Sequence, residues 1–176
     1  NNVVTNWSTQ IDITAVSSYT NSSTCSGAVS GTLSNGSVTT GGGTLASGVG
    51  TFAGVSYTKT DTIYFKYTSG GLTLCGSTAI TAAASSTVSG VTLAVKSGSS
   101  STITADGSST TILEATVVDA NNNLISGSSI TLNIPSNGGT TTSPATTNGS
   151  GIASFTLTSS TTAGTYAYTA TGGSVT

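Results

Sequence analysis

Charged residues are almost absent from this sequence of 176 residues. It contains three lysines, no arginine, no histidine and five acidic residues, and its formal net charge is −2. A protein that neutralises nucleic-acid phosphates needs a basic stripe, and three lysines cannot form one. Without histidine the chain has no imidazole base, no Ser-His-Asp triad and no nitrogen ligand for zinc. We therefore expect no nucleic-acid partner, no enzymatic activity and no cofactor.

Long apolar runs and proline are also scarce. No run of about 18 apolar residues occurs, so the sequence predicts no membrane-spanning segment. The chain starts at Asn1 without a basic, apolar leader, which is typical of a secreted protein whose signal peptide has been removed. Pro135 and Pro144 are the only prolines, and this excludes a proline-rich stalk.

Small hydroxyl residues and glycine dominate what remains. Serine and threonine make up 70 positions and glycine 23, a composition also found in disordered linkers. However, 35% of the residues are hydrophobic, the mean hydropathy is +0.19, and the apolar residues alternate with polar ones. Threonine and valine favour strands, whereas serine, glycine and asparagine favour turns. The sequence therefore predicts an all-β protein.

The sequence repeats once, at an offset of about 102 residues. Four pairs of segments match in the same order: Ile11–Ser18 with Leu113–Ala120, Gly27–Ser37 with Gly127–Gly138, Ser47–Val55 with Ser150–Thr158, and Thr62–Gly71 with Thr165–Gly173. The offset is the length of one β-sandwich domain. We predict two tandem sandwiches at 10–86 and 87–176, preceded by a tail at 1–9.

The second copy resembles the bacterial Ig-like repeats of the invasin and intimin type. The resemblance covers about 80 residues and rests on the segment Thr104–Ala170, which reads TADGSSTTILEATVVDANNNLISG and, later, TTNGSGIASFTLTSSTTAGTYAYTA. Asn122 stands where that family usually has glycine. The first copy shows a looser Ig-like pattern over Gly48–Ala84. The resemblance implies two Ig-like sandwiches in series, in a spacer or structural module rather than an enzyme.

The copies differ at their ends. The first copy continues beyond its Gly-Gly pair into a closing strand at Ala79–Ala82, whereas the second stops three residues after Gly173. We therefore expect the second sandwich to lack its last strand and to expose an unpaired edge. The tail offers a matching strand, because Val3, Thr5, Trp7 and Thr9 fall on one face. Our hypothesis is that this tail completes the second sandwich of a neighbouring subunit, which gives a head-to-tail homopolymer.

The chain resembles the subunits of the thread filaments of thermoacidophilic archaea. The resemblance rests on its small size, its processed start, its scarce charge, its Asn-X-Ser/Thr sequons and its incomplete second sandwich. Such threads consist of small, Ser/Thr-rich, N-glycosylated Ig-like subunits joined by N-terminal donor strands. The resemblance implies an extracellular filament on the cell surface, with roles in adhesion, cell–cell contact or biofilms. Two other readings stay open: a non-polymerising spacer from a larger adhesin or S-layer protein, and a carbohydrate-binding module.

Two modifications are predicted for an extracellular protein of this kind. Cys25 and Cys75 lie in the first copy and are expected to form a disulfide in an oxidising exterior, with two free buried thiols as the alternative. Four Asn-X-Ser/Thr sequons are candidate N-glycosylation sites, although chance alone gives about four in this composition. They begin at Asn6, Asn21, Asn35 and Asn148.

The remaining polar and aromatic groups favour structural roles. The run from Asp119 to Asn123 has oxygen ligands at alternate positions, as in a calcium loop, but a β-turn is the better interpretation. Asp12 and Glu114 occupy equivalent strand positions and do not suggest a pair of catalytic carboxylates. Five aromatic residues are expected in cores and cross-strand pairs rather than in a sugar platform: Tyr64, Phe65, Tyr67, Tyr166 and Tyr168. With few titratable groups, the fold is expected to tolerate acid.

Overall fold

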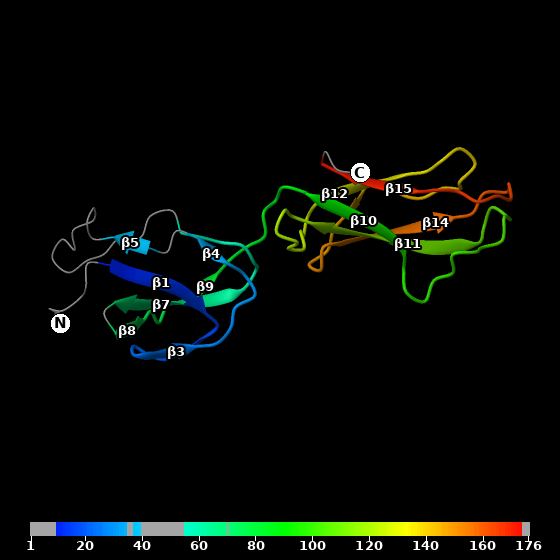
Figure 1. The fold of residues 1–176 in the computed structure, drawn as a ribbon. Coiled ribbons are helices and arrows are strands. Elements are labelled where there is room, and N and C mark those ends of the chain that lie inside the picture. Colours follow the sequence, from blue (N-terminus) through cyan, green and yellow to red (C-terminus); the bar gives the residue numbers. More distant parts are fainter. Residues whose placement is uncertain (1–9, 35–36, 40–54, 70, 174–176) are drawn as a thin grey trace. The chain divides into compact units, whose positions relative to one another are not determined.

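The structure, a computed structural model, describes residues 10–34, 37–39, 55–69 and 71–173 (Figure 1). The chain divides into two compact units, Asn1–Ala83 (unit 1) and Ala84–Thr176 (unit 2). Each unit consists of Ig-like β-structure, and the described residues contain strands but no helix, as the all-β prediction requires. Among these residues, accordingly, no helix is long and apolar enough to cross a membrane. The predicted tail at 1–9 lies outside the described residues.

Unit 1 is built around one antiparallel sheet with the strand order β5-β1-β7-β8, and β9 also pairs with β7. Two short pairs, β2 with β3 and β4 with β6, accompany it. The strands are β1 (Gln10–Val16), β2 (Ser18–Asn21), β3 (Thr24–Ser26), β4 (Leu33–Ser34), β5 (Ser37–Thr39), β6 (Ser56–Tyr57), β7 (Thr62–Ser69), β8 (Leu72–Cys75) and β9 (Ile80–Thr81).

The main sheet of unit 1 buries residues on both of its faces. Ile11 and Ile13 of β1 are buried on one face, and Val16 is buried on the other because successive side chains of a strand point in opposite directions. Val16 packs with the two cysteines, and Tyr19 and Tyr64 pack against this cluster. The hairpin formed by β2 and β3 therefore contributes a second, small core to unit 1.

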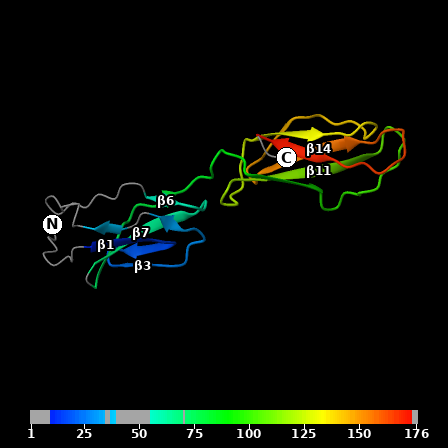
Figure 2. The ribbon, with the colours of Figure 1, turned by 45° about the horizontal axis from the view of Figure 1, so that its top comes forward.

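Unit 2 is a sandwich of two three-stranded antiparallel sheets (Figures 1 and 2). Their strand orders are β10-β11-β14 and β13-β12-β15. The strands are β10 (Gly90–Val95), β11 (Thr110–Val118), β12 (Ser129–Asn133), β13 (Ala145–Thr146), β14 (Ile152–Thr158) and β15 (Thr169–Gly172).

The core of unit 2 follows directly from alternation along its strands. In β11, β12 and β14 every second residue is buried, and the residues between them face outward. The buried cluster contains Leu113, Ala115, Val117, Ile125, Ile130, Leu132, Ala153, Phe155, Leu157 and Ala170. Phe155 is 1% exposed and is among the largest fully buried side chains. The alternating pattern read from the sequence thus indicates the core face of unit 2 correctly.

The predicted correspondence between the two copies does not extend to strand pairing. In unit 1, β1 pairs directly with β7 over Asp12–Val16. The matching strands of unit 2 lie in different sheets, because β11 pairs with β10 and β14 whereas β15 pairs with β12. Similar alternation and similar turn residues allow more than one pairing partner, so the local match alone does not determine which strands become neighbours.

Candidate functional site

Strand β15 forms one edge of its sheet, and one of its sides has no partner among the described residues. It pairs with β12 from Thr169 opposite Asn133 to Gly172 opposite Ile130. The segment before it, Gly164–Tyr168, is not part of a strand, and no backbone hydrogen bond joins it to another described residue. The sequence predicted a strand that runs through Thr165–Gly173, but only its second half is paired. The first half has no neighbouring strand to bind.

A cleft of about 590 Å³ lies beside this segment. Its lining combines apolar residues of the sheet β10-β11-β14 with residues of the loops, many of which carry hydroxyl groups. The lining residues are Val95, Ser101, Thr102, Ile103, Ala105, Thr111, Leu113, Gly138, Leu157, Ser159, Ser160, Thr162, Ala163, Gly164, Thr165, Tyr166 and Tyr168. They come from the end of β10, the start of β11, the end of β14, the loops between the strands and the segment before β15. The cleft thus lies at one end of the sheet β10-β11-β14, beside the segment that precedes β15.

Val95 shows that this part of the sandwich is incompletely covered. Within β10 it lies on the same face as Val91 and Leu93, both of which pack against the core. Val95 is nevertheless 37% exposed. A cavity of about 150 Å³ holds a benzene ring, so a cleft of this size has room for more than one large side chain.

The opposite edge of unit 2 is covered by its own chain. The N–H of Thr140 donates to the carbonyl of Thr158 (3.0 Å), and the carbonyl of Thr140 accepts from the N–H of Thr158 (2.8 Å). The hydroxyl of Thr141 also donates to the carbonyl of Thr156 (2.8 Å). These bonds satisfy edge groups of β14 that would otherwise bind another strand. The edge of β15 has no such cover among the described residues.

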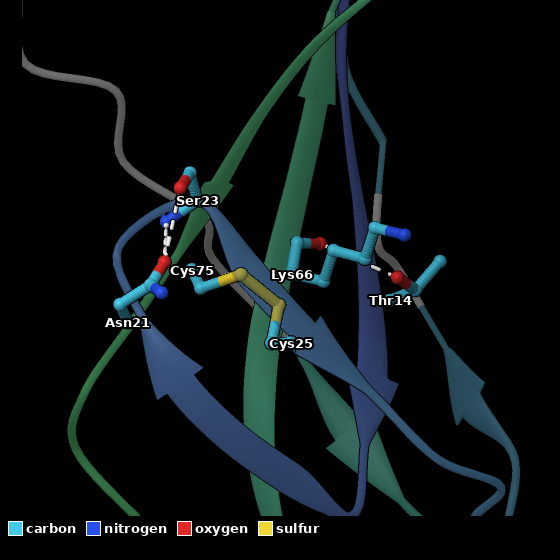
Figure 3. Close-up of a disulfide and its surroundings, with 6 residues drawn as sticks. All are labelled: Thr14, Asn21, Ser23, Cys25, Lys66 and Cys75. Carbon is cyan, nitrogen blue, oxygen red and sulfur yellow. Dashed lines mark hydrogen bonds between the residues drawn. A yellow bond between two sulfur atoms is a disulfide. The ribbon is translucent and has the colours of Figure 1, made fainter.

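A disulfide covers part of the corresponding edge of unit 1 (Figure 3). Cys25 of β3 and Cys75 of β8 are joined, with their Cα atoms 5.9 Å apart, so the disulfide predicted from the sequence is present. The N–H of Cys75 donates to the carbonyl of Ser22 (2.9 Å). The hairpin of β2 and β3 is therefore attached to β8 by a covalent bond and by a hydrogen bond.

The segment predicted to be a β-turn rather than a calcium loop is indeed a hydrogen-bonded turn. Asp119 is buried, and its Oδ1 accepts the N–H groups of Asn121 (2.8 Å) and Asn123 (2.9 Å). Its Oδ2 accepts the side-chain amide of Asn123 (3.0 Å) and the N–H of Ser85 (3.0 Å). Burial raises the pKa of Asp119, but these donors outweigh it and lower the pKa to about 2. No group of three or more histidine, cysteine or acidic residues that could hold a metal occurs in the described ranges.

Two further aspartates hold turns in the same way. Asp106 accepts the N–H groups of Ser109 (2.6 Å) and Ser108 (2.8 Å), and these bonds hold its pKa well below the usual range. In unit 1 the Tyr57 hydroxyl donates to the Asp61 carboxylate, and Ser30 donates to it as well. These donors lower the pKa of Asp61. Both carboxylates hold loops together, and neither lies beside a nucleophile with a general base.

Asp12 and Glu114, which occupy equivalent positions in the two copies of the repeat, lie in unit 1 and unit 2 respectively. Asp12 is exposed on β1. Glu114 forms an ion pair with Lys96 (3.2 Å) and accepts a hydrogen bond from the Ser154 hydroxyl (3.3 Å) on the outer face of β11. The contacts of Glu114 are thus an ion pair and a hydrogen bond within unit 2.

The five aromatic residues divide between packing and the cleft. Tyr64 stacks on Tyr19, with ring centroids 5.8 Å apart. Phe65 and Tyr67 are adjacent, with centroids 6.4 Å apart. Tyr166 and Tyr168 both line the cleft of unit 2. Tyr168 also packs against the core, as expected, and its hydroxyl donates to the carbonyl of Gly138 (2.6 Å).

Two of the four sequons lie in described, exposed turns. Asn21 ends β2, and its Oδ1 accepts the N–H (3.0 Å) and the hydroxyl (2.9 Å) of Ser23. Asn148 precedes β14, and its Oδ1 accepts the N–H groups of Ser150 (2.9 Å) and Ile152 (3.1 Å). In both cases the bonds use the oxygen of the amide. Asn6 and Asn35 lie outside the described residues, as do Val3, Thr5, Trp7 and Thr9 of the predicted donor strand.

Sequence reasoning found the open edge but not the residues of the cleft. Val95 lies in β10, and nothing in the sequence separates it from Val91 or Leu93. Ile103 and Leu157 likewise look like ordinary loop or strand residues. Their shared place in the lining of the cleft follows only from the tertiary structure of unit 2.

The comparisons with known proteins agree with the geometry of unit 2. Residues 93–176 match the family model of the bacterial Ig-like domain (group 1). No curated protein and no solved structure matches the chain. The match and the disulfide point to a surface-associated or extracellular protein. Unit 2 is thus an Ig-like repeat that is similar to this bacterial domain.

Proposed function

We propose that this protein is a structural subunit of an extracellular filament and that unit 2 accepts a donor strand from a neighbouring subunit. The observation that carries the proposal is that one side of Gly164–Gly172 has no partner strand among the described residues and lies next to an uncharged cleft. An added strand would bond to this edge through its backbone and fill the cleft with every second side chain.

The occupant of the cleft is the N-terminal segment Asn1–Thr9. It is nine residues long, as is the open edge Gly164–Gly172. Its Val3, Thr5, Trp7 and Thr9 would face the cleft, while the opposite face would consist of Asn2, Val4, Asn6 and Ser8. An uncharged strand suits this site because the lining residues of the cleft carry no charge.

The favourable contributions to the free energy of association are large enough to allow a stable contact between subunits. Six to eight backbone hydrogen bonds would contribute about 4–12 kcal/mol. Burial of Trp7 and Val3 would add about 1.5–3 kcal/mol each. Ordering of the tail and loss of free motion on association oppose these gains. Because each subunit donates one strand and accepts one, the contact is head-to-tail and leads to an open fibre rather than a closed dimer.

We also propose that the filament is secreted and N-glycosylated and that it resembles the archaeal threads. The exposed amides of Asn21 and Asn148 would carry N-linked glycans, and their Oδ1 hydrogen bonds would survive because the sugar attaches to Nδ2. The role is adhesive or scaffolding, and it is not catalytic. An intact mass of the native protein equal to that of the bare chain would contradict the glycan part.

Deletion of residues 1–9 tests the polymer. Size-exclusion chromatography with light scattering should show concentration-dependent polymers of the full chain and monomers of the truncated chain. Equal polymerisation of the two would overturn the proposal. A full chain that stays monomeric at every concentration would also overturn it.

A pair of matched substitutions tests the cleft itself. Val95→Lys places a charge in the cleft, where the folded monomer tolerates it because Val95 is exposed, and it should abolish polymers. Leu124→Lys is the control, because Leu124 is 49% exposed in the same unit and does not line the cleft. It should leave the polymers unchanged. Polymers of the Val95→Lys variant would show that another surface makes the contact.

The second candidate is a non-polymerising Ig-like spacer within a larger adhesin or S-layer protein. The family match favours it, because it concerns the Ig-like repeat alone. In that case the edge of β15 would be completed by other residues of the same polypeptide. A monomeric full chain would support this reading. A carbohydrate-binding role has less support, since Tyr166 and Tyr168 line the cleft of unit 2 and Tyr168 packs against the core.

A further inference from the structure

The segment that links the two units is held by hydrogen bonds at both ends. The N–H of Ala82 donates to the carbonyl of Asp61 in unit 1 (3.1 Å). The N–H of Ser85 donates to Oδ2 of Asp119 in unit 2 (3.0 Å). No hydrogen bond joins Ala83 or Ala84 to any residue that the structure describes. The unbonded part of the linker is therefore two residues long.

Unit 2 also holds the residues that follow Ser85. The N–H of Thr87 donates to the hydroxyl of Ser85 (3.1 Å), and the N–H of Ser89 donates to the carbonyl of Val118 (2.9 Å). Val88 packs against the core of unit 2. Residues 85–89 thus belong structurally to unit 2, although β10 begins only at Gly90.

The Asp119 side chain is held in position by burial and by several hydrogen bonds. It is 2% exposed and accepts two further backbone N–H groups and one side-chain amide from Asn121 and Asn123. Its own N–H donates to the carbonyl of Asn123 (2.9 Å). The carboxylate cannot follow a movement of Ser85 without breaking these bonds.

We propose that Asp119 is a latch that fixes residues 85–89 to unit 2 and confines bending between the units to Ala83 and Ala84. Each residue has two soft backbone dihedrals, so the pivot has about four. Alanine limits these angles more than glycine would, because its Cβ excludes most of the conformations with positive φ. The inference rests on the linker alone and is independent of the filament.

Amide hydrogen exchange of the full chain, followed by NMR, tests the latch. The amides of Ala82 and Ser85 should exchange about tenfold or more slowly than those of Ala83 and Ala84, since an amide bonded to a charged acceptor opens rarely. Asp119→Ala should remove the protection of Ser85 and leave that of Ala82 unchanged. Comparable protection at all four amides, or an unchanged Ser85 in the variant, would overturn the proposal.

Asp106→Ala is the matched control. Asp106 lies in the same unit and accepts a comparable set of donors from Ser108, Ser109 and Ser159, but it does not touch the linker. It should leave the exchange of Ala82 and Ser85 unchanged. A loss of Ser85 protection in this control equal to that in Asp119→Ala would contradict a specific role of Asp119.

Ser85→Pro is a second variant that tests the latch if Asp119→Ala fails to fold. It removes the N–H donor of residue 85 and leaves the Asp119 carboxylate in place. It also removes the hydroxyl that accepts the N–H of Thr87, so its relaxation is compared, where both variants fold, with that of Asp119→Ala, which keeps this hydroxyl. Protection of the core amide of Val117 reports that unit 2 is intact in either variant. With unit 2 intact, ¹⁵N relaxation should show increased motion at residues 86–88 relative to the unmodified chain. Unchanged relaxation there would overturn the latch.

Discussion

The two units differ in how the edge strands of their sheets are covered. In unit 1 the strand β8 is joined to a neighbouring hairpin by the Cys25–Cys75 disulfide and by the bond from Cys75 to Ser22. In unit 2 the covered edge is β14, whereas one side of β15 has no partner strand among the described residues and lies near a cleft. The comparison teaches that one composition, rich in threonine, serine and glycine, supports both a covered edge and one that no described residue covers. Position in the fold, rather than strand sequence, makes the difference.

The largest expected effect comes from removal of the cover in unit 1. Replacement of both cysteines, Cys25→Ser with Cys75→Ser, should destabilise unit 1 by about 4 kcal/mol, because a closed loop of this length restricts the unfolded chain. Unit 2 contains neither cysteine and should unfold as before. Calorimetry should show one transition shifted to lower temperature and one unchanged. Equal shifts of both transitions would show that the units do not unfold independently.

A smaller effect is expected from opening the covered edge of unit 2. Gly139 has φ of +96°, and a Cβ there would lie 2.1 Å from the backbone oxygen of Thr158. Gly139→Ala should therefore disturb the contact between Thr140 and Thr158 and cost about 1–3 kcal/mol. Chemical denaturation measures the change. Gly149→Ala is the control, because no atom lies within 4 Å of its added Cβ, and a similar loss there would contradict the steric explanation.

The smallest effect concerns acid. The pKa of Asp119 is lowered to about 2 in the folded state, so its contribution is fully present above the pKa of the unfolded chain, near 4. That contribution is lost as the pH falls from about 4 toward 2. Asp106 acts in the same direction in unit 2, as does Asp61 in unit 1. The unfolding midpoint should be flat from pH 7 to about 5 and fall below about 4.

Comparison with Asp119→Asn isolates one group in this pH dependence. The variant should be less stable at pH 7 and should lose less stability between pH 4 and 2. An unfolding midpoint that falls steeply between pH 7 and 5 would contradict the prediction, because none of the three lowered pKa values lies in that range.

The alternation of the sequence predicted much of unit 2. The buried positions of β11, β12 and β14 follow the period of two. The disulfide and the turn at Asp119 were also predicted correctly. These features could be predicted because they depend on residues close together in the sequence. Successive side chains of a strand point to opposite faces, and Asp and Asn stabilise turns by accepting nearby backbone N–H groups.

Long-range pairing could not be predicted in the same way. The matches between the two copies suggested equivalent strands, yet β1 bonds to β7 while β11 and β15 lie in separate sheets. Tyr166 was expected in a core or a cross-strand pair but lines the cleft. In both cases the outcome depends on residues far apart in the chain, and strands of similar alternation are equally able to pair with several partners.

By itself, the sequence determined that this protein consists of strands, which residues face the cores, and that charge-based chemistry is scarce. These properties follow from composition and from the two-residue period of a strand. Only the tertiary structure decided that β12 is the one strand paired with β15 in the described part of the chain, that Val95 and Tyr166 line one cleft, and that Asp119 binds the N–H of Ser85. The reason is physical: an edge, a cleft or a latch exists only after distant segments have been brought together.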